Sequence, residues 1–134
     1  MKKAMALVLI LILVFALAGC SVSAEEKMLL LKNDGVEKIS VTSLPEYYNY
    51  SFSGQDTQAI VDYLSELNLI SDFSENPNEY YGKVWVISIE YESGEAVTVY
   101  HFGNMFIRAE DEPWYKMTYE EASRFGDLLE QLNS

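Results

Sequence analysis

The segment at residues 84–109, VWVISIEYESGEAVTVYHFGNMFIRA, constrains the fold most strongly because its apolar side chains alternate along the chain. Side chains of a β-strand point to opposite faces in turn, so every second residue shares a face. Two glycine-containing turns, Ser93-Gly94 and Gly103-Asn104, divide the segment into three strands. The pattern predicts a three-stranded antiparallel meander. The apolar face of its first strand carries Trp85, Ile87, Ile89 and Tyr91.

The register of the meander follows from placing the apolar residues of all three strands on one face. A one-residue slip would move a whole strand to the other face. The second face is mixed in character and should be at least partly exposed to water. That mixed face carries Ser88, Glu90, Val97, Val99, His101, Phe106 and Arg108. The predicted pairs are Tyr91 with Ala96, Ile89 with Thr98, Ile87 with Tyr100, Trp85 with Phe102, Phe102 with Met105, and Tyr100 with Ile107.

Two amphipathic segments, residues 54–68 and 119–132, predict helices on either side of the meander in the chain. Apolar side chains recur in both at the spacing of one helix face. Both segments also begin with the spacing of a capping box, from Ser53 in the first and from Thr118 to Glu121 in the second. The apolar stripes are Ile60, Tyr63, Leu64 and Leu67 in the first helix, and Ala122, Phe125, Leu129 and Leu132 in the second.

These elements predict an α+β fold, an antiparallel sheet with a central three- to four-stranded meander and two helices on one face. Residues 114–117 supply the fourth strand, and residues 28–32 and 36–42 form a hairpin around Asp34-Gly35 with Lys32 opposite Glu37. The face covered by the helices is expected to carry Trp85, Ile87, Tyr100 and Ile107.

A tyrosine-rich stretch precedes the first helix. Its alternating aromatic residues predict a short strand from Tyr48 to Phe52. Aromatic rings stack on sugars and peptides, so Tyr47, Tyr48 and Tyr50 are a candidate interaction surface. The alternative is that these rings only cover the edge of the sheet and the start of the helix.

Charge and cysteine content exclude several classes of function. The 134 residues carry a net charge of −12, which disfavours binding to nucleic acid or to an anionic lipid surface. Cys20 is the one cysteine, so neither a disulfide within the chain nor a thiolate metal cluster can form. A chain of this length is expected to fold as a single domain.

The N-terminal 20 residues have the organisation of a secretory leader. Met1-Lys2-Lys3 is followed by 15 apolar residues at 4–18 and by Leu17-Ala18-Gly19-Cys20. The apolar run is shorter than the roughly 20 residues of a transmembrane helix and fits a signal peptide. The last four residues resemble the lipobox of bacterial lipoproteins. An ordinary signal peptide with a cysteine there by chance is the alternative.

The lipobox resemblance implies a covalent anchor on the extracytoplasmic side of the cell membrane. The Cys20 sulfur would receive a diacylglyceryl group, and cleavage would occur between Gly19 and Cys20. Two acyl chains hold a protein stably on a membrane, whereas one chain binds only marginally. Residues 1–19 would be removed, residues 20–27 would be the lipidated cysteine and its tether, and residues 28–134 would form the α+β domain.

Motifs of common enzymes and metal sites do not occur in this sequence. His101 is the single histidine, and there is no G-x-S-x-G, Walker A, dinucleotide-binding or H-E-x-x-H pattern. Residues 72–76 begin with the rhythm of a calcium-binding EF-hand loop. Pro77 and Lys83 stand where that loop requires glycine and glutamate, so we reject this site. We expect no cofactor, no metal and a structural or solvent-facing His101.

A second resemblance covers residues 80–132. The segments Tyr91-Glu92-Ser93-Gly94, His101-Phe102-Gly103-Asn104, Trp114-Tyr115-Lys116-Met117 and Glu120-Glu121-Ala122 resemble a small uncharacterised domain of Gram-positive lipoproteins and membrane-sensor ectodomains. These are core and turn residues, so the resemblance implies a shared fold and no activity.

The sequence favours a non-catalytic, membrane-anchored binding or accessory module for a protein or a cell-envelope polymer. A regulator or inhibitor of an extracellular enzyme is the alternative, and it would use the exposed loops at residues 71–82 or 110–113. A small hydrolase is a third class, but abundant acidic residues alone do not form a catalytic pair.

Overall fold

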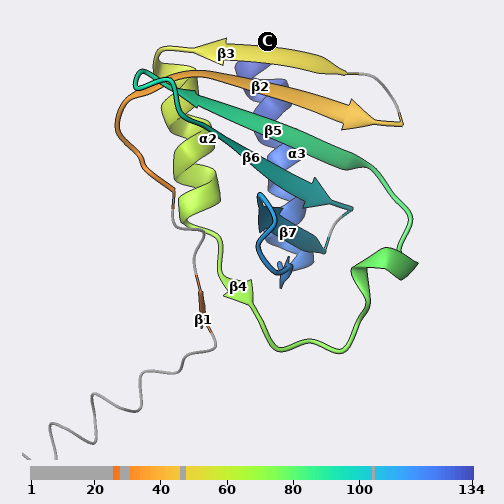
Figure 1. Ribbon diagram of the computed structural model, residues 1–134. Coiled ribbons are helices and arrows are strands. Elements are labelled where there is room, and N and C mark those ends of the chain that lie inside the picture. Colours follow the sequence, from red (N-terminus) through yellow and green to blue (C-terminus); the bar gives the residue numbers. More distant parts are fainter. Residues whose placement is uncertain (1–25, 28–30, 46–47, 104) are drawn as a thin grey trace, which may run out of the picture.

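The computed structural model describes residues 26–27, 31–45, 48–103 and 105–134. Within these residues, eight strands form one antiparallel sheet, and two α-helices pack beside it (Figure 1). This architecture confirms the α+β fold. The elements are β1 Glu26–Lys27, β2 Val36–Leu44, β3 Asn49–Ser53, α2 Gln55–Ser65, β4 Leu69–Ile70, the 3-10 helix η1 Pro77–Glu79, β5 Val84–Tyr91, β6 Ala96–Phe102, β7 Phe106–Ala109, β8 Tyr115–Lys116 and α3 Tyr119–Asn133.

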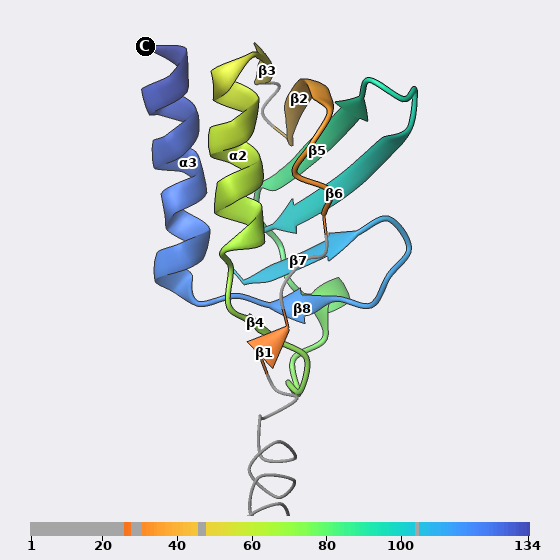
Figure 2. The same ribbon diagram turned by 90° about the vertical axis from the view of Figure 1, so that its left-hand side faces the viewer.

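The central meander and the single helical layer are both confirmed. The strand order is β1-β4-β8-β7-β6-β5-β2-β3, so the consecutive strands β5 to β8 lie side by side in the middle of the sheet. Figure 2 shows α2 and α3 next to each other on one face of the sheet. We call this the helix-covered face and the other the open face. No helix among the described residues has the length and hydropathy to cross a membrane.

The hydrophobic core lies between the helices and the helix-covered face. Alternate residues of β2, β5 and β6 point into it because strand side chains alternate. The apolar stripes of both helices meet them, with Tyr63 and Leu132 only partly buried at the margin. Full burial of one such side chain stabilises the fold by about 1.5–3 kcal/mol. The fully buried residues include Ile39, Val41, Ile60, Leu64, Ile87, Ile89, Val99, Ile107 and Phe125.

The register between β5 and β6 differs from the prediction by one residue. Ile87 lies opposite Val99 and Ile89 opposite Val97, so the predicted pairs of the two isoleucines are wrong. The turn explains the shift, because Tyr91 N donates to Glu95 O at 2.9 Å and Gly94 has a φ of 91°. This is a three-residue loop that ends in a residue with positive φ. The set expected in the core therefore lies on the open face: Ala96, Thr98, Tyr100 and Phe102.

The same shift recurs between β6 and β7. His101 lies opposite Ile107, and Phe102 lies opposite Phe106. The predicted pairs of Phe102 with Met105 and of Tyr100 with Ile107 are therefore wrong, because three residues rather than two separate these strands. His101 is consequently buried beneath the helices, whereas Tyr100 lies on the open face.

The N-terminal hairpin predicted around Asp34-Gly35 is not formed as expected. Strand β2 pairs with β3 on one side and with β5 on the other. Lys32 forms an exposed ion pair with Glu95 at 3.1 Å instead of facing Glu37. Residues 28–30 lie outside the described part, and β1, within the expected tether, pairs with β4. Short strands at 49–53 and 115–116 agree with the predicted strands there.

The two helices begin differently. Gly54 is the N-cap of α2 and Ser53 provides no side-chain cap, so the first predicted capping box is wrong. In the second, Thr118 is confirmed as the N-cap, because its Oγ1 accepts from Glu121 N at 3.2 Å, while the Glu121 carboxylate accepts from the Thr118 hydroxyl at 2.9 Å. The buried Glu121 carboxylate also accepts a hydrogen bond from Asn68 N at 2.9 Å. It therefore ties the segment after α2 to the start of α3.

Candidate functional site

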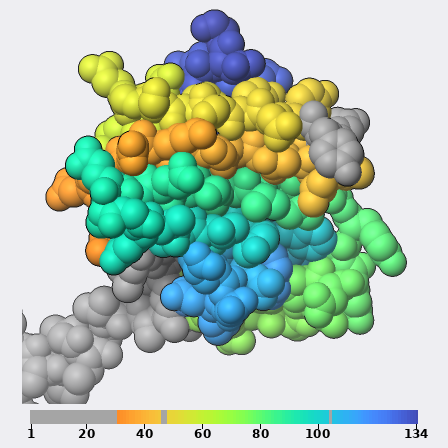
Figure 3. Space-filling model, turned by 45° about the horizontal axis from the view of Figure 1, so that its top comes forward, coloured from red at the N-terminus to blue at the C-terminus, as the bar shows by residue number. Residues whose placement is uncertain are grey.

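The open face of the sheet has a polar half and an aromatic half. Small polar and charged side chains occupy β2 and the C-terminal ends of the neighbouring strands β3 and β5, including Lys38, Ser51 and Glu90. Rings gather at the other half, where residues 71–82 lie against β6 and β7. In the space-filling view, the light-green atoms of this segment lie beside the blue atoms that follow β6 (Figure 3).

The segment at residues 71–82 is fastened to the open face by specific contacts. The rings of Phe73 and Tyr80 pack on the buried Phe106, with centroid distances of 5.5 and 5.3 Å. Lys116 of β8 donates to Glu75 at 2.6 Å, and this hydrogen bond lowers the pKa of the Glu75 carboxyl from its usual value. The loop is therefore held in place, and it forms one wall of a pocket.

An aromatic pocket of about 320 Å³ opens between this segment and the sheet. The volume is at the lower end of the range of ligand pockets in proteins. Strands β5, β6 and β7 form its floor, and Trp114, before β8, and the loop form its walls. We call it the Arg108 pocket, and its lining residues are Pro77, Asn78, Tyr80, Val84, Tyr100, Phe102, Arg108 and Trp114.

Arg108 is the one charged residue lining this pocket in the described part of the chain. Its guanidinium carbon lies 4.6 Å from the ring centre of Trp114 and 5.4 Å from that of Tyr100. Stacking on aromatic rings attracts the cation by about 0.5–2 kcal/mol. Its Nε is buried without a hydrogen-bond partner, and no carboxylate among the described residues pairs with the side chain.

The nearest acidic residue in the sequence is engaged elsewhere. Glu110 accepts a hydrogen bond from Thr98 N at 2.7 Å, and its own N donates to Thr98 O at 2.8 Å. Glu110 also has a φ of 52°, which is rare for a residue with a side chain. Glu110 thus bonds to β6 with both its backbone N–H and its side chain, and neither bond involves Arg108.

A second, apolar pocket of about 260 Å³ lies on the other side of Tyr80. It shares Tyr80 and Phe102 with the Arg108 pocket, so the two form a continuous aromatic surface. Tyr81 lies at its margin and is 99% exposed. The Tyr81 ring is therefore accessible to another molecule that approaches this surface.

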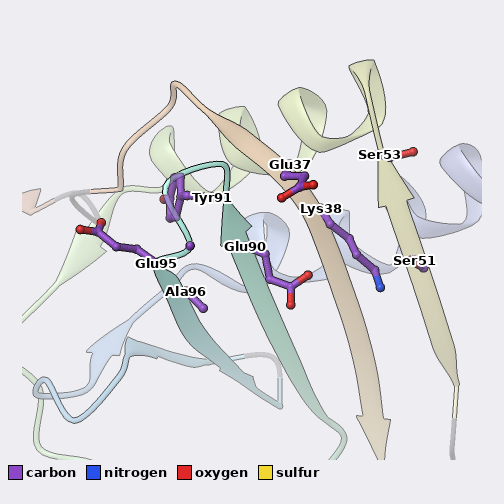
Figure 4. A pocket seen from close by; sticks show the side chains of 9 residues that line it. Glu37, Lys38, Ser51, Ser53, Glu90, Tyr91, Glu95 and Ala96 are labelled. Atoms are coloured by element: carbon purple, nitrogen blue, oxygen red, sulfur yellow. The ribbon is translucent and has the colours of Figure 1, made fainter.

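A larger groove of about 570 Å³ lies at the polar half of the open face. Figure 4 shows Lys38 of β2 and Glu90 of β5 along it, with Glu37 and Glu95 near one end. Lys38 and Glu90 are cross-strand partners in the register, so a positive and a negative side chain face each other in this groove. Among the described residues, no group of three or more histidine, cysteine or acidic side chains could hold a metal ion.

The candidate surface of tyrosines lies at the β3 edge of the sheet. Tyr47 is outside the described residues, while Tyr48, Tyr50 and Phe52 stack in succession with centroid distances of 6.4 and 6.1 Å. Tyr50 also contacts the Trp85 ring at 6.2 Å, and the Lys83 ammonium lies 5.1 Å from the Tyr48 ring. The ladder thus covers the sheet edge, and 46% of Tyr48 remains exposed.

His101 is enclosed in the core and stacks on Phe125 at a centroid distance of 4.9 Å. Its Nε2 lies 3.2 Å from the Tyr63 hydroxyl, which itself donates to Glu121 O at 2.7 Å. The hydroxyl has one proton, so Nε2 must donate to it and Nδ1 is an acceptor without a partner. Burial lowers the pKa of His101 to about 4, and burial also raises the pKa of Tyr63.

Sequence reasoning placed Arg108 correctly on the face opposite the helices, but it did not identify the pocket. Trp114 and Tyr80 are far from Arg108 in the sequence, and only the folded position of residues 71–82 brings the rings together. The only feature of the sequence that pointed to this region was the unusual length of the polar loop at residues 71–82, because loops of this length are often functional. Cys20 and the lipobox lie outside the described residues.

Comparison of this chain with protein-family models, with curated proteins and with solved structures gave no match.

Proposed function

We propose that this chain is a lipid-anchored, extracytoplasmic binding module without catalytic activity, and that the Arg108 pocket and its surrounding rings are its binding surface. The anchor part of the proposal is supported by the basic start, the apolar run and the Leu17-Ala18-Gly19-Cys20 sequence. Two acyl chains on Cys20 would keep the domain at the membrane. The ligand would then be a protein or polymer of the cell envelope.

The observation that carries the binding role is an arginine held without a carboxylate partner between aromatic rings. Arg108 could have paired with one of the chain's 21 acidic residues, yet the described residues give it none. An enclosed polar hydrogen without an acceptor costs about 1–3 kcal/mol. Unsatisfied groups and backbone strain gather at functional sites, and the positive φ of Glu110 lies two residues away.

The proposal of a non-catalytic role is supported by the environment of the single histidine. A general base must reach the proton that it abstracts from a substrate. His101 is 1% exposed and lies between the sheet and α3, on the face opposite the Arg108 pocket.

A regulator of an extracellular enzyme is the second candidate, and the exposure of Tyr81 favours it. A rigid loop that presents an aromatic ring to solvent can enter the cleft of another protein, and aromatic residues are enriched among the residues that dominate such interfaces. Both candidates use the same face of the molecule. They differ in the bound partner, which would be a protein or polymer of the cell envelope for the module and an extracellular enzyme for the regulator.

Site-specific photo-crosslinking in intact cells tests the binding surface. A photoreactive phenylalanine analogue replaces Tyr81 in the full-length chain, and a matched variant carries it at Gln131, an exposed residue of α3. We expect a discrete adduct from position 81 and none from position 131. Equal labelling at both positions, or labelling from 131 alone, would show that the open face is not the binding surface. Mass spectrometry of the adduct identifies the bound partner as a polymer, an envelope protein or an extracellular enzyme.

A further inference from the structure

We infer that the Arg108 pocket binds the carboxylate of an apolar monoanion, such as a chain end or a small aromatic acid. The inference rests on the proposed function in one respect, because it takes the open face as the binding surface. It adds the chemistry of the ligand group. Four features carry it: an unpaired guanidinium, aromatic walls, the size of the pocket and the charge of the whole chain.

Charge complementarity requires an anionic group in the pocket. Arg108 contributes the one formal charge of the lining, and it has no carboxylate partner in the described part of the molecule. A guanidinium can donate up to five hydrogen bonds in a fixed plane. A ligand carboxylate would provide the acceptors that the chain itself does not.

The stacking of Arg108 determines how that anion is approached. Trp114 and Tyr100 both lie near the guanidinium, at 4.6 and 5.4 Å from its central carbon. These two rings limit the directions from which an anion can reach the guanidinium. Because Nε is enclosed, the terminal Nη groups are the donors open to a ligand. Paired N–H donors in one plane match the two oxygens of a carboxylate.

Net charge favours a carboxylate over a phosphate dianion. The chain carries −12 overall, and its acidic residues 110–112 follow Arg108 closely in the sequence. One cation in such a field compensates a single negative charge but not two. Apart from Asn78, the rest of the lining is apolar or aromatic, and Val84 and Phe102 in the floor and Tyr80 in a wall would exclude water from an apolar ligand group.

The pocket volume of about 320 Å³ limits the group that enters it. A cavity at the lower end of the usual range accommodates one ring or one short side chain together with a carboxylate. The remainder of a longer ligand would continue over the shared Tyr80 and Phe102 rings into the neighbouring apolar pocket.

Titration with N-acetyl-phenylalanine and with its amide tests the inference, because the amide differs only in lacking the negative charge. The readout is the indole N–H signals of the isotope-labelled full chain in detergent micelles. Trp114 lines the pocket, whereas Trp85 packs against Phe125 on the helix-covered face and serves as an internal reference. We expect the acid to shift the Trp114 signal while the Trp85 signal stays in place.

Two variants separate the guanidinium from general charge effects. Arg108→Gln removes the charged donor, and a charge-assisted hydrogen bond contributes about 1.5–3 kcal/mol. We therefore expect roughly ten- to hundred-fold weaker binding. Lys38→Gln removes an exposed cation from the polar half of the same face and should bind like the wild type. Unchanged thermal unfolding confirms that both variants are folded.

The possible outcomes are distinct. Equal binding of acid and amide, undiminished binding by Arg108→Gln, or no movement of Trp114 at millimolar ligand would each overturn the inference. The crosslink from position 81 does not depend on this chemistry, so a positive crosslink with a negative titration leaves the binding surface intact and removes only the carboxylate. Tighter binding of a peptide with a free carboxyl end than of the acid alone identifies a chain end as the source.

Discussion

At the scale of single residues, two enclosed polar atoms distinguish the two faces of the sheet. Among the described residues, Arg108 Nε and His101 Nδ1 are both buried without a hydrogen-bond partner. The unpaired atom of Arg108 is a donor on a cation beside a pocket. The unpaired Nδ1 of His101 is an acceptor enclosed among aromatic rings, because the ring's proton is on Nε2, which donates to the Tyr63 hydroxyl. Protonation of His101 would bury a charge and a donor together, which explains its lowered pKa.

The lowered pKa of His101 predicts a loss of stability in acid. The pKa is about 4 in the folded chain against 6.5 in the unfolded chain, so the unfolded chain takes up the proton first. The contribution is complete above pH 6.5 and is lost as the pH falls towards 4, by about 3 kcal/mol in total. His101→Phe keeps a ring against Phe125 and cannot titrate. Urea unfolding of both full chains in detergent across this range should show the wild type losing more stability by that amount.

The comparison of pH slopes makes this prediction independent of the absolute stability of the variant. The carboxylates titrate in the same range, but they are common to both chains and cancel in the difference. Parallel pH profiles for the wild type and His101→Phe would show that His101 is accessible to protons in the folded chain.

At the scale of elements, the sequence predicted both α-helices, β2, β3 and the strands of the meander, but neither the short strands β1 and β4 nor the register of the meander. The alternation of Ile87 and Ile89 identified their face correctly. In β6 both faces are apolar, because Val97 and Val99 face the core while Tyr100 and Phe102 line the Arg108 pocket with the loop at residues 71–82 and Trp114. Alternation cannot decide between two covered faces. The register between β5 and β6 is set instead by the three-residue loop between them, which ends in Gly94 with its positive φ.

The candidate site was less predictable than the fold, because part of its lining comes from residues far apart in the sequence. Arg108 and Trp114 are close in the sequence, and their contact follows from pairing β7 with β8. The remaining wall comes from Tyr80, whose position depends on packing against Phe106 and on the ion pair between Lys116 and Glu75. Such long-range side-chain contacts leave no periodic signal in the sequence.

The observed register predicts which residue pairs are energetically coupled. Ile87 and Val99 face each other beneath the helices, and a cross-strand pair of this kind contributes about 0.2–1 kcal/mol. Tyr100 lies on the opposite face and should show no coupling with Ile87. A double-mutant cycle of Ile87→Ala with Val99→Ala, and a matched cycle with Tyr100→Ala, measure both values by urea unfolding. Stronger coupling of Ile87 to Tyr100 would favour the register expected from the sequence.

The loss in the free energy of unfolding caused by Ile87→Ala alone provides an internal check on the double-mutant cycle. Ile87 is fully buried, so Ile87→Ala should lower the free energy of unfolding by about 2–5 kcal/mol. Ser88, the next residue along the strand, is half-buried on the open face, and Ser88→Ala should change it by less than about 0.5 kcal/mol.

At the scale of the whole molecule, the two faces of the sheet differ in what covers them. The helices seal one face and supply the stability of a fold that no internal disulfide supports, since Cys20 is the single cysteine. The other face is covered over one half by residues 71–82 and leaves the Arg108 pocket accessible. If Cys20 carries the anchor, the segment to β1 is five residues long, so the domain would stay close to the membrane.

We expect a lipid anchor on Cys20, and not charge, to hold the whole chain at the membrane. Removal of Lys2 and Lys3 with the leader leaves seven basic residues against 21 acidic ones, a net charge of −14. Such a chain has no electrostatic attraction to anionic lipid, whereas each buried methylene of an acyl chain contributes about 0.8 kcal/mol. We therefore expect the wild type to stay with membranes in high salt and to leave them in detergent.

The variant Cys20→Ser removes the acceptor of the lipid and leaves the core residues of the domain unchanged, so it should lose the acyl modification. Its matched control is Ser21→Ala, which alters the neighbouring position and keeps the thiol. Mass spectrometry of the mature amino terminus measures the outcome directly, and the wild type and Ser21→Ala should both begin with an acylated Cys20. An unmodified terminus, or one well beyond residue 20, would mean that the apolar leader is an ordinary signal peptide and that the domain is released from the membrane.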